Sequence, residues 1–257
     1  MARWTAFAHL GDYRFNASRL TQMWDRLHAG DAEPLPRDPA VLEAWRLCHE
    51  GDFEKATEAG LAAGQEGLTV ANKAMALYAC YVEPSEKARL GLLLEVARRA
   101  EAQVASQPDN PNAWYWQAFA LGRYSQGISV AKALAQGLGP RVKNALERTV
   151  ALQPRHADAH VALGTFHAEV IDKVGALIGG MTYGARRETG LRLFREGLQI
   201  HPDSIVGMIE AASGLLMLDG EPATEEANRL LDQAANAVPL DAVEHLHVQR
   251  ARAEMQA

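Results

Sequence analysis

Three histidines and two carboxylates lie close together near the middle of this chain, and such groups can bind a metal ion. His156, His160 and His167 are spaced by four and seven residues, with Asp158 and Glu169 beside them. Imidazole and carboxylate side chains on one helix face are ligands for zinc. However, His156 precedes the predicted helix, His160 and His167 occupy positions where bulky packing groups are expected, and H-E-x-x-H is absent. We therefore predict packing roles and no metal.

Motifs for nucleophilic or nucleotide chemistry are missing from the sequence. There is no G-x-S-x-G elbow, no G-x-x-x-x-G-K-[ST] loop and no dinucleotide fingerprint after a predicted strand. The carboxylates are spread along predicted helix surfaces, where pairs four residues apart account for them. The sequence therefore predicts no catalytic residue, no cofactor and no enzyme.

The charge and cysteine content narrow the possible partners. The formal net charge is −6, and the longest basic groupings are the pairs Arg98-Arg99 and Arg186-Arg187. A nucleic-acid backbone requires a basic face, so we expect no nucleic-acid partner. The two cysteines, Cys48 and Cys80, are too few for a disulfide framework and are expected to be reduced and mostly buried.

Hydropathy and the N-terminal residues bear on localisation. Hydrophobic residues make up 48% of the chain, enough for a core, but no apolar run approaches the roughly 18 residues that cross a bilayer. The first fifteen residues lack the apolar core and cleavage site of a secretory signal. The expectation is a cytoplasmic protein without a transmembrane segment.

The segment 157–202 holds two halves of a helical-hairpin motif. In AHVALGTFH, Leu163 and Gly164 fit the pattern W-x2-L-G-x2-Y, with His160 and His167 in place of its aromatic residues. The second half, GLRLFREGLQIHP, has Gly190, Phe194, Gly197 and Pro202 at pattern positions. Small residues let two helices approach closely, a phenylalanine fills the space beside them, and proline ends the hairpin. The segment resembles a tetratricopeptide (TPR) repeat.

The pattern recurs with irregular spacing. Hairpin-ending prolines at 108, 154, 202 and 239 are separated by 46, 48 and 37 residues, whereas a plain TPR repeat takes about 34 residues. Two hairpins therefore carry insertions, at residues 123–139 and 169–184, both expected on the same edge of the stack. The fold class predicted is all-α: an α-α superhelix of four to five hairpins with terminal capping helices.

A more specific resemblance covers residues 72–239, about two thirds of the chain. The stretches NAWYWQAFALGRYSQ and HADAHVALGTFHAEV, with the helices ending at Pro154 and Pro202, resemble the TPR-like domain of the regulator of microtubule dynamics family and its bacterial relatives. The resemblance implies the fold and a bacterial-type scaffold. The membrane anchor of some family members has no counterpart here, so a microtubule role is not implied.

The predicted repeats place a group of side chains on the concave surface. Asn112, Tyr115, Phe119 and Arg123 are successive positions of a first helix, and Ile209 is the corresponding position of a later one. Aromatic groups beside an arginine suit a peptide that carries apolar side chains and an acidic group. Alternatively, Tyr115 and Phe119 pack beneath the following insertion and Arg123 caps a helix end.

The second insertion suggests a different function. Residues 174–185 contain no charge and four glycines, and the pocket candidates within them are Leu177, Ile178, Met181 and Tyr183. The run could fold back and pack, form a mobile lid, or touch a membrane surface. If both insertions closed the concave channel, the chain would carry a small molecule or lipid.

The main prediction is a non-enzymatic scaffold that binds a protein or peptide segment. The expected divisions are an N-terminal helical cap with a proline-rich linker at 1–40, the TPR-like domain at 41–239 and a capping helix at 240–257. Two short helices are expected in the N-terminal part, one at about 17–28 and another before it. Apolar ends of a helical stack often pair, so self-association is possible.

Overall fold

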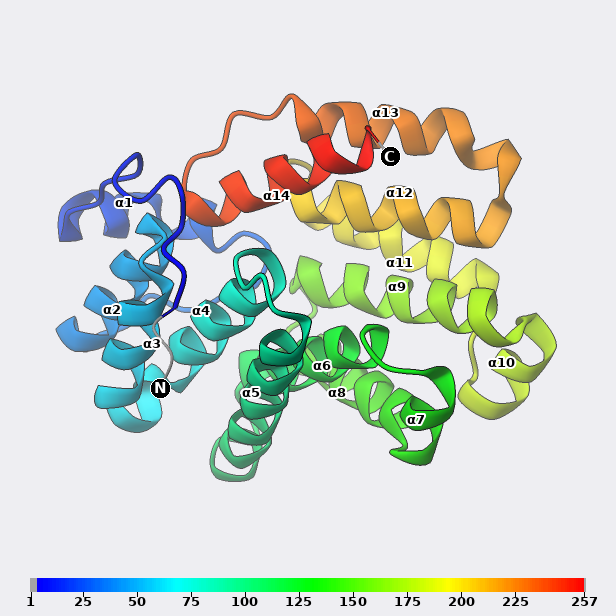
Figure 1. Cartoon of the computed structure of the whole chain (residues 1–257), viewed down its shortest axis with the longest axis horizontal. Coiled ribbons are helices and arrows are strands. Elements are labelled where there is room, and N and C mark those ends of the chain that lie inside the picture. The colour runs from blue at the N-terminus through cyan, green and yellow to red at the C-terminus, as the bar shows by residue number, and fades with distance from the viewer. Residues whose placement is uncertain (1–3, 257) are drawn as a thin grey trace. The chain divides into compact units, whose positions relative to one another are not determined.

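The computed structural model describes residues 4–256, in which every regular element is a helix (Figure 1). Residues 1–3 and 257, at the outer ends of the two predicted caps, lie outside the described residues. The all-α prediction is confirmed for the described range. None of its helices combines the length and the apolar character needed to span a membrane.

Consecutive helices pack as antiparallel hairpins. The hairpins include α2 (Pro39–Glu50) with α3 (Phe53–Ala62), α4 (Leu68–Tyr81) with α5 (Glu86–Ser106), α9 (Ala157–Val174) with α11 (Arg187–Ile200), and α12 (Ile205–Asp219) with α13 (Thr224–Ala235). Successive hairpins also pack on one another, α3 against α4 and α9 against α12. Helices α6 (Pro111–Gln126) and α8 (Leu138–Leu152) are the pair predicted to end before Pro154. The remaining elements are α1 (Ala17–Leu27), the 3-10 turns η1 (Gly64–Gly67) and η2 (Glu221–Ala223), and α14 (Ala242–Glu254).

Both predicted insertions form short helices at the expected places. Helix α7 (Val130–Ala135) separates α6 from α8, and α10 (Ala176–Tyr183) separates α9 from α11. Gly175 and Gly184 bracket α10 with φ values of 82° and 65°, in the left-handed region that glycine adopts without strain. The chain therefore leaves and re-enters its hairpin through glycine at each end of α10.

Local capping explains where the helices begin. The Asn110 side chain accepts hydrogen bonds from the amides of Asn112 and Ala113 at the start of α6, and Pro111 occupies the first turn. Ser204 caps α12 through the amide of Gly207. Capping side chains satisfy helix amides that have no partner within the helix, and proline lacks the amide that would be orphaned there.

The chain divides into two compact units. Unit 1 comprises the described residues up to 28 together with 33–148 and 240–243, and unit 2 comprises 29–32, 149–239 and 244 onward. Unit 1 therefore contains α1 to α7, and unit 2 contains α9 to α13 and most of α14. The predicted domain divisions after residues 40 and 239 remain a prediction.

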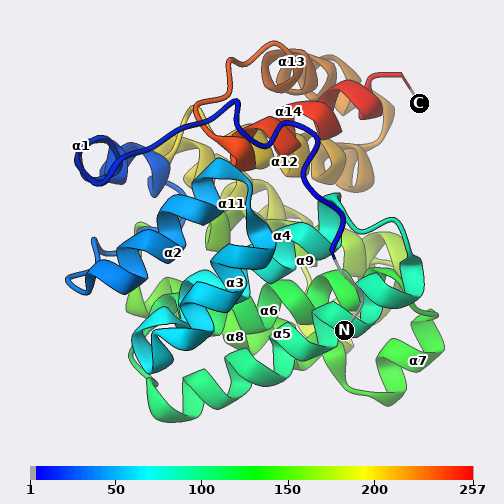
Figure 2. The same ribbon diagram turned by 60° about the vertical axis from the view of Figure 1, so that its left-hand side comes forward.

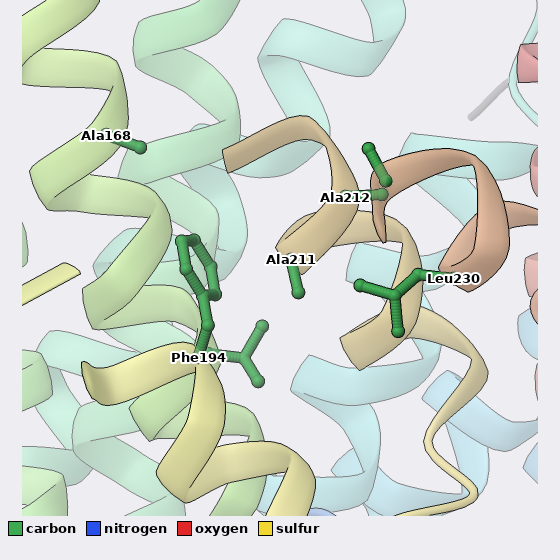
Figure 3. Packing of buried hydrophobic residues seen from close by; sticks show 7 residues of the cluster. Ala168, Phe194, Ala211, Ala212 and Leu230 are labelled. Atoms are coloured by element: carbon green, nitrogen blue, oxygen red, sulfur yellow. The ribbon is translucent and has the colours of Figure 1, made fainter. Parts of the chain in front are cut away.

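The core of unit 2 is built around Phe194 of α11, whose ring lies between α9 and α12 in Figure 3. A Cβ atom on Gly164 of α9 would lie 2.9 Å from the Phe194 ring, and one on Gly214 of α12 would lie 2.2 Å from it. The ring thus fits only because two neighbouring helices carry glycine at the contact. The small residue predicted at position 164 has the expected packing role.

The N-terminal region differs from the expected pair of helices. It contains one α-helix, α1, preceded by non-helical residues 4–16 that include a turn at 8–12. We call residues 4–15 the arm; it is the dark-blue trace that leads to α1 in Figure 2. The extra helix did not form because Gly11 and Asp12 interrupt the segment, with Gly11 at a φ of 103°.

Candidate functional site

The α6 helix presents an aromatic face with an arginine at its end. Tyr115 is buried, whereas Phe119 and Arg123 are half-buried. The Tyr115 and Phe119 ring centroids are 6.1 Å apart, and the Arg123 guanidinium carbon lies 5.4 Å from the Phe119 centroid. A guanidinium over an aromatic ring is held by the ring's negative face. The Arg123 Nη1 also donates to Gln126 Oε1 at 3.2 Å. We call Tyr115, Phe119 and Arg123 the α6 face.

The buried Trp116 packs against the two aromatic rings of this face. Its ring centroid is 5.1 Å from those of Tyr115 and Phe119, and the residue is 4% exposed. The indole Nε1 is buried and has no hydrogen-bond partner among the described residues. Trp116 was missed because the repeat pattern assigned its tryptophan position to Trp114, which instead donates to the carbonyl of Pro108.

The predicted Asn112 does not extend the α6 face. It is buried, and its amide donates to the Glu33 carboxylate at 2.6 Å. The partner comes from the loop after α1, 79 residues earlier in the chain. Asn112 therefore ties that loop to the start of α6, a contact that helix periodicity does not reveal.

Ile209 was predicted as a groove residue, and this prediction was wrong. Its side chain is fully buried, at 0% exposure, in a cluster of unit 2. The cluster also contains Ala234 of α13 and Val248 and Ala251 of α14. The C-terminal helix α14 packs on α12 and covers the position that would be open in a stack that ended at α13.

Polar groups of two unit 2 helices, α9 and α14, converge instead on Glu210 of α12. Thr165 of α9 donates to one carboxylate oxygen of Glu210 at 3.3 Å, and Arg250 of α14 donates to the other at 2.6 Å. Arg250 also donates to Glu254 at 2.7 Å. We call Thr165, Glu210 and Arg250 the unit 2 network. No sequence pattern indicated it, because its members are 40 or more residues apart.

Three of the four residues proposed to line a closed pocket are exposed. Leu177, Ile178 and Met181 are 76%, 58% and 82% exposed, and Tyr183 is half-buried. In contrast, Gly179 is buried, and a Cβ there would lie 3.0 Å from Val170 of α9. Helix α10 thus rests on α9 through glycine and directs its large apolar side chains away, which differs from the cavity wall that a carrier would need.

The three histidines considered as metal ligands have separate structural partners in unit 2. The His156 ring accepts from the Ala159 amide as the cap of α9, and the His167 ring accepts from the Arg186 amide. His160 bonds the Pro154 carbonyl through Nε2. Within residues 4–256 no group of three or more His, Cys, Asp or Glu side chains could hold a metal ion.

A different histidine pair is buried in unit 1. His49 Nδ1 is 2.6 Å from Asp241 Oδ2, and its Nε2 is 3.2 Å from His28 Nε2. An aspartate that fixes one imidazole nitrogen polarises the other, as in general-base catalysis. Here the second nitrogen, His49 Nε2, is hydrogen-bonded to the His28 imidazole and not to a reacting group. His28 is in turn stacked on Trp24 at 4.1 Å. The arrangement therefore anchors residues 240–243 to α2.

Comparisons with known proteins support the fold. No family model matches the chain, and no curated protein matches it. A solved structure of TTC0263, a thermophilic TPR protein in Thermus thermophilus, shares 16% sequence identity with a TM-score of 0.57, covering 83% of this chain and 97% of that one. A structure of YrrB, a TPR protein with an unusual peptide-binding site, shares 14% identity with a TM-score of 0.42, covering 91% of this chain and all of that one.

The likeness to TTC0263 confirms the fold class, and the comparisons leave the finer family open. The chain is similar to TPR proteins, and its helical hairpins belong to the α-α superhelix class. The resemblance to the regulator of microtubule dynamics family is not confirmed by them and remains a prediction.

Proposed function

We propose that the chain is a non-enzymatic interaction scaffold whose α6 face receives a polypeptide segment. The observation that carries this proposal is the half-exposed Arg123 guanidinium stacked over Phe119 at 5.4 Å. The all-helical TPR-like fold supports it as an analogy of fold. A cytoplasmic location and a bacterial origin belong to the same proposal.

The side chains of the α6 face indicate which kind of polypeptide segment would bind there. Phe119 offers part of an aromatic ring to an apolar side chain, and a guanidinium is well suited to bind a carboxylate. Arg123, which donates to the neutral Gln126 amide at 3.2 Å, would exchange or share that bond with the carboxylate of the ligand. Buried Tyr115 and Trp116 hold the Phe119 ring in place, so little side-chain freedom is lost on binding. The expected ligand has an apolar residue next to Asp, Glu or a C-terminal carboxylate.

Site-specific photo-crosslinking tests this proposal. A benzophenone amino acid at position 119 should crosslink, in cells of the natural host, to a discrete polypeptide that mass spectrometry identifies. Adding Arg123→Glu should reduce that crosslink at least about tenfold, because the reversed charge repels the carboxylate. Arg123→Lys keeps the charge and loses the planar stack, so it should retain an intermediate yield.

A matched control separates binding from random contact. The same photoreactive group at Lys55, an exposed position of unit 1, should give none of the position-119 product. If both positions crosslink the same proteins, or if Arg123→Glu leaves the product unchanged in a folded chain, the α6 face is not the binding surface.

A further inference from the structure

The arm is attached to unit 1 in the way that a bound peptide is attached to a receptor. Its amides donate to side chains of the helices: the Trp4 amide to Glu54 at 3.4 Å, and the Thr5 amide to the Tyr78 hydroxyl at 3.0 Å. The Phe15 amide donates to Glu50 at 2.8 Å. Bonds from receptor side chains to a ligand backbone hold an extended segment whatever its sequence, and leave pockets to read the side chains.

Two aromatic residues of the arm, Trp4 and Phe7, pack against side chains of unit 1. The Trp4 ring stacks on Tyr78 of α4 with centroids 4.0 Å apart, and Phe7 is buried with an edge contact to Phe53 of α3 at 6.1 Å. Thr5 and Ala6 between them are exposed. A half-buried Trp4 and a buried Phe7, separated by small exposed residues, resemble the aromatic hot spots of peptide recognition.

The turn between α2 and α3 is shaped around Phe7. Gly51 ends α2 with a φ of 88°, and a Cβ on it would lie 2.4 Å from Phe7 Cδ1. A side chain at position 51 would therefore meet both an unfavourable backbone conformation and the aromatic ring. The missing Cβ leaves the space that Phe7 occupies.

Tyr78 has a second bond that prepares it for the arm. Its hydroxyl donates to Glu83 at 2.7 Å, which turns the oxygen lone pairs toward the Thr5 amide. Burial, and after it this bond to Glu83, raises the pKa of the Tyr78 hydroxyl above its usual value. The receiving groups Glu50, Glu54 and Tyr78 come from three consecutive helices, which makes the surface part of the folded hairpins.

From this geometry we propose that the surface formed by Tyr78, Glu54, Glu50, Gly51 and Phe53 is a second peptide-binding surface, and that the arm is its built-in competitor. The partner is an extended segment of another protein with a tryptophan and a phenylalanine three residues apart. We call this surface the arm surface. It shares no residue with the α6 face, so failure of either proposal leaves the other standing.

The amount by which the arm weakens the binding of an external peptide can be estimated. A tethered ligand acts at an effective concentration of about millimolar, so a partner in solution binds only when it is stronger than the arm or when the arm is released. Binding of an external peptide should therefore be weak in the natural chain and strengthen once the anchors of the arm are removed.

The first test uses the full-length chain and a fluorescent peptide of residues 2–16. Trp4→Ala with Phe7→Ala should bind the peptide at least about tenfold more tightly than the natural chain, as measured by fluorescence anisotropy. A peptide with the same two alanines should not bind. The proposal is overturned if the variant keeps its helical circular dichroism and does not bind the peptide.

A second test guards against a folding defect in that variant. A site for a sequence-specific protease is inserted in the exposed turn beside Gly11, so that the arm is cut after the protein has folded. The labelled peptide should then replace the cut fragment while the helices persist. Unfolding of unit 1 on loss of the fragment would show that the arm is an integral part of the fold and would overturn the proposal.

A pair of glycine variants tests the Phe7 space. Gly51→Ala should abolish peptide binding in the Trp4→Ala, Phe7→Ala background, because its Cβ enters the Phe7 position. Gly64→Ala is the matched control: φ is 69° there too, but a Cβ meets nothing within 4 Å. Equal binding in the two glycine variants argues against the proposed surface. So does a natural chain that dimerises through its arms, since the occupant would then be a second copy.

Discussion

The α6 face of unit 1 and the unit 2 network each contain an arginine, but the partners of the two arginines differ. Arg123 is stacked on the Phe119 ring, whereas Arg250 donates to the carboxylates of Glu210 and Glu254. Glu210 is 8% exposed and therefore depends on its partners. A buried carboxylate requires neutralisation by the fold, while the half-buried Arg123 guanidinium is held by an aromatic ring and by the neutral Gln126 amide. The Glu210 arrangement stabilises unit 2, whereas the Arg123 arrangement is the one that we propose for recognition.

The largest expected difference concerns two apolar residues that were predicted to line one groove. Ile209→Ala should lower the free energy of unfolding of unit 2 by about 3 kcal/mol, because it opens a cavity in a fully buried cluster. Phe119→Ala should cost unit 1 about 1 kcal/mol, since the ring is only half-buried. Urea titration followed by circular dichroism measures both.

Hydrogen exchange locates each loss within its own unit. Amides of α12 should lose protection in Ile209→Ala, and amides of α6 should do so in Phe119→Ala. Comparable losses of stability from the two variants would mean that the α6 face is as closed as the unit 2 cluster, and the contrast between the regions would be lost.

How far the sequence alone predicts this molecule depends on the range of the interactions. The hairpins, the prolines that end them and both insertions follow from local helix periodicity and from residues such as Gly164 and Pro202. The location of Ile209 could not be predicted, because it depends on a helix that begins more than 30 residues later. For the same reason the partners of Asn112 and Glu210 were missed. Side-chain pairing across helices is set by tertiary packing, which repeat patterns do not specify.

Replacing Arg250 and Arg123 one at a time by methionine should give the next largest difference between the two regions. Arg250→Met leaves the Glu210 carboxylate without its 2.6 Å donor and should destabilise unit 2 by about 2 kcal/mol. Arg123→Met retains apolar contact with Phe119 and should change stability by less than about 1 kcal/mol. The same urea titrations apply. Restoring most of the stability of Arg250→Met by adding Glu210→Met would show that the cost comes from the unpaired carboxylate.

The smallest expected effect tests whether the unit 2 network takes part in binding at all. Thr165→Val is nearly isosteric and removes only the 3.3 Å bond to Glu210, whose other oxygen keeps Arg250. The free energy of unfolding should therefore change by about 0.5 to 1 kcal/mol. The yield of the crosslink at position 119 should not change, because a hydrogen bond that only stabilises the fold does not contribute to ligand binding. A lost crosslink at unchanged stability would instead show that Thr165 affects binding, and the division between a stabilising region and a recognising one would have to be redrawn.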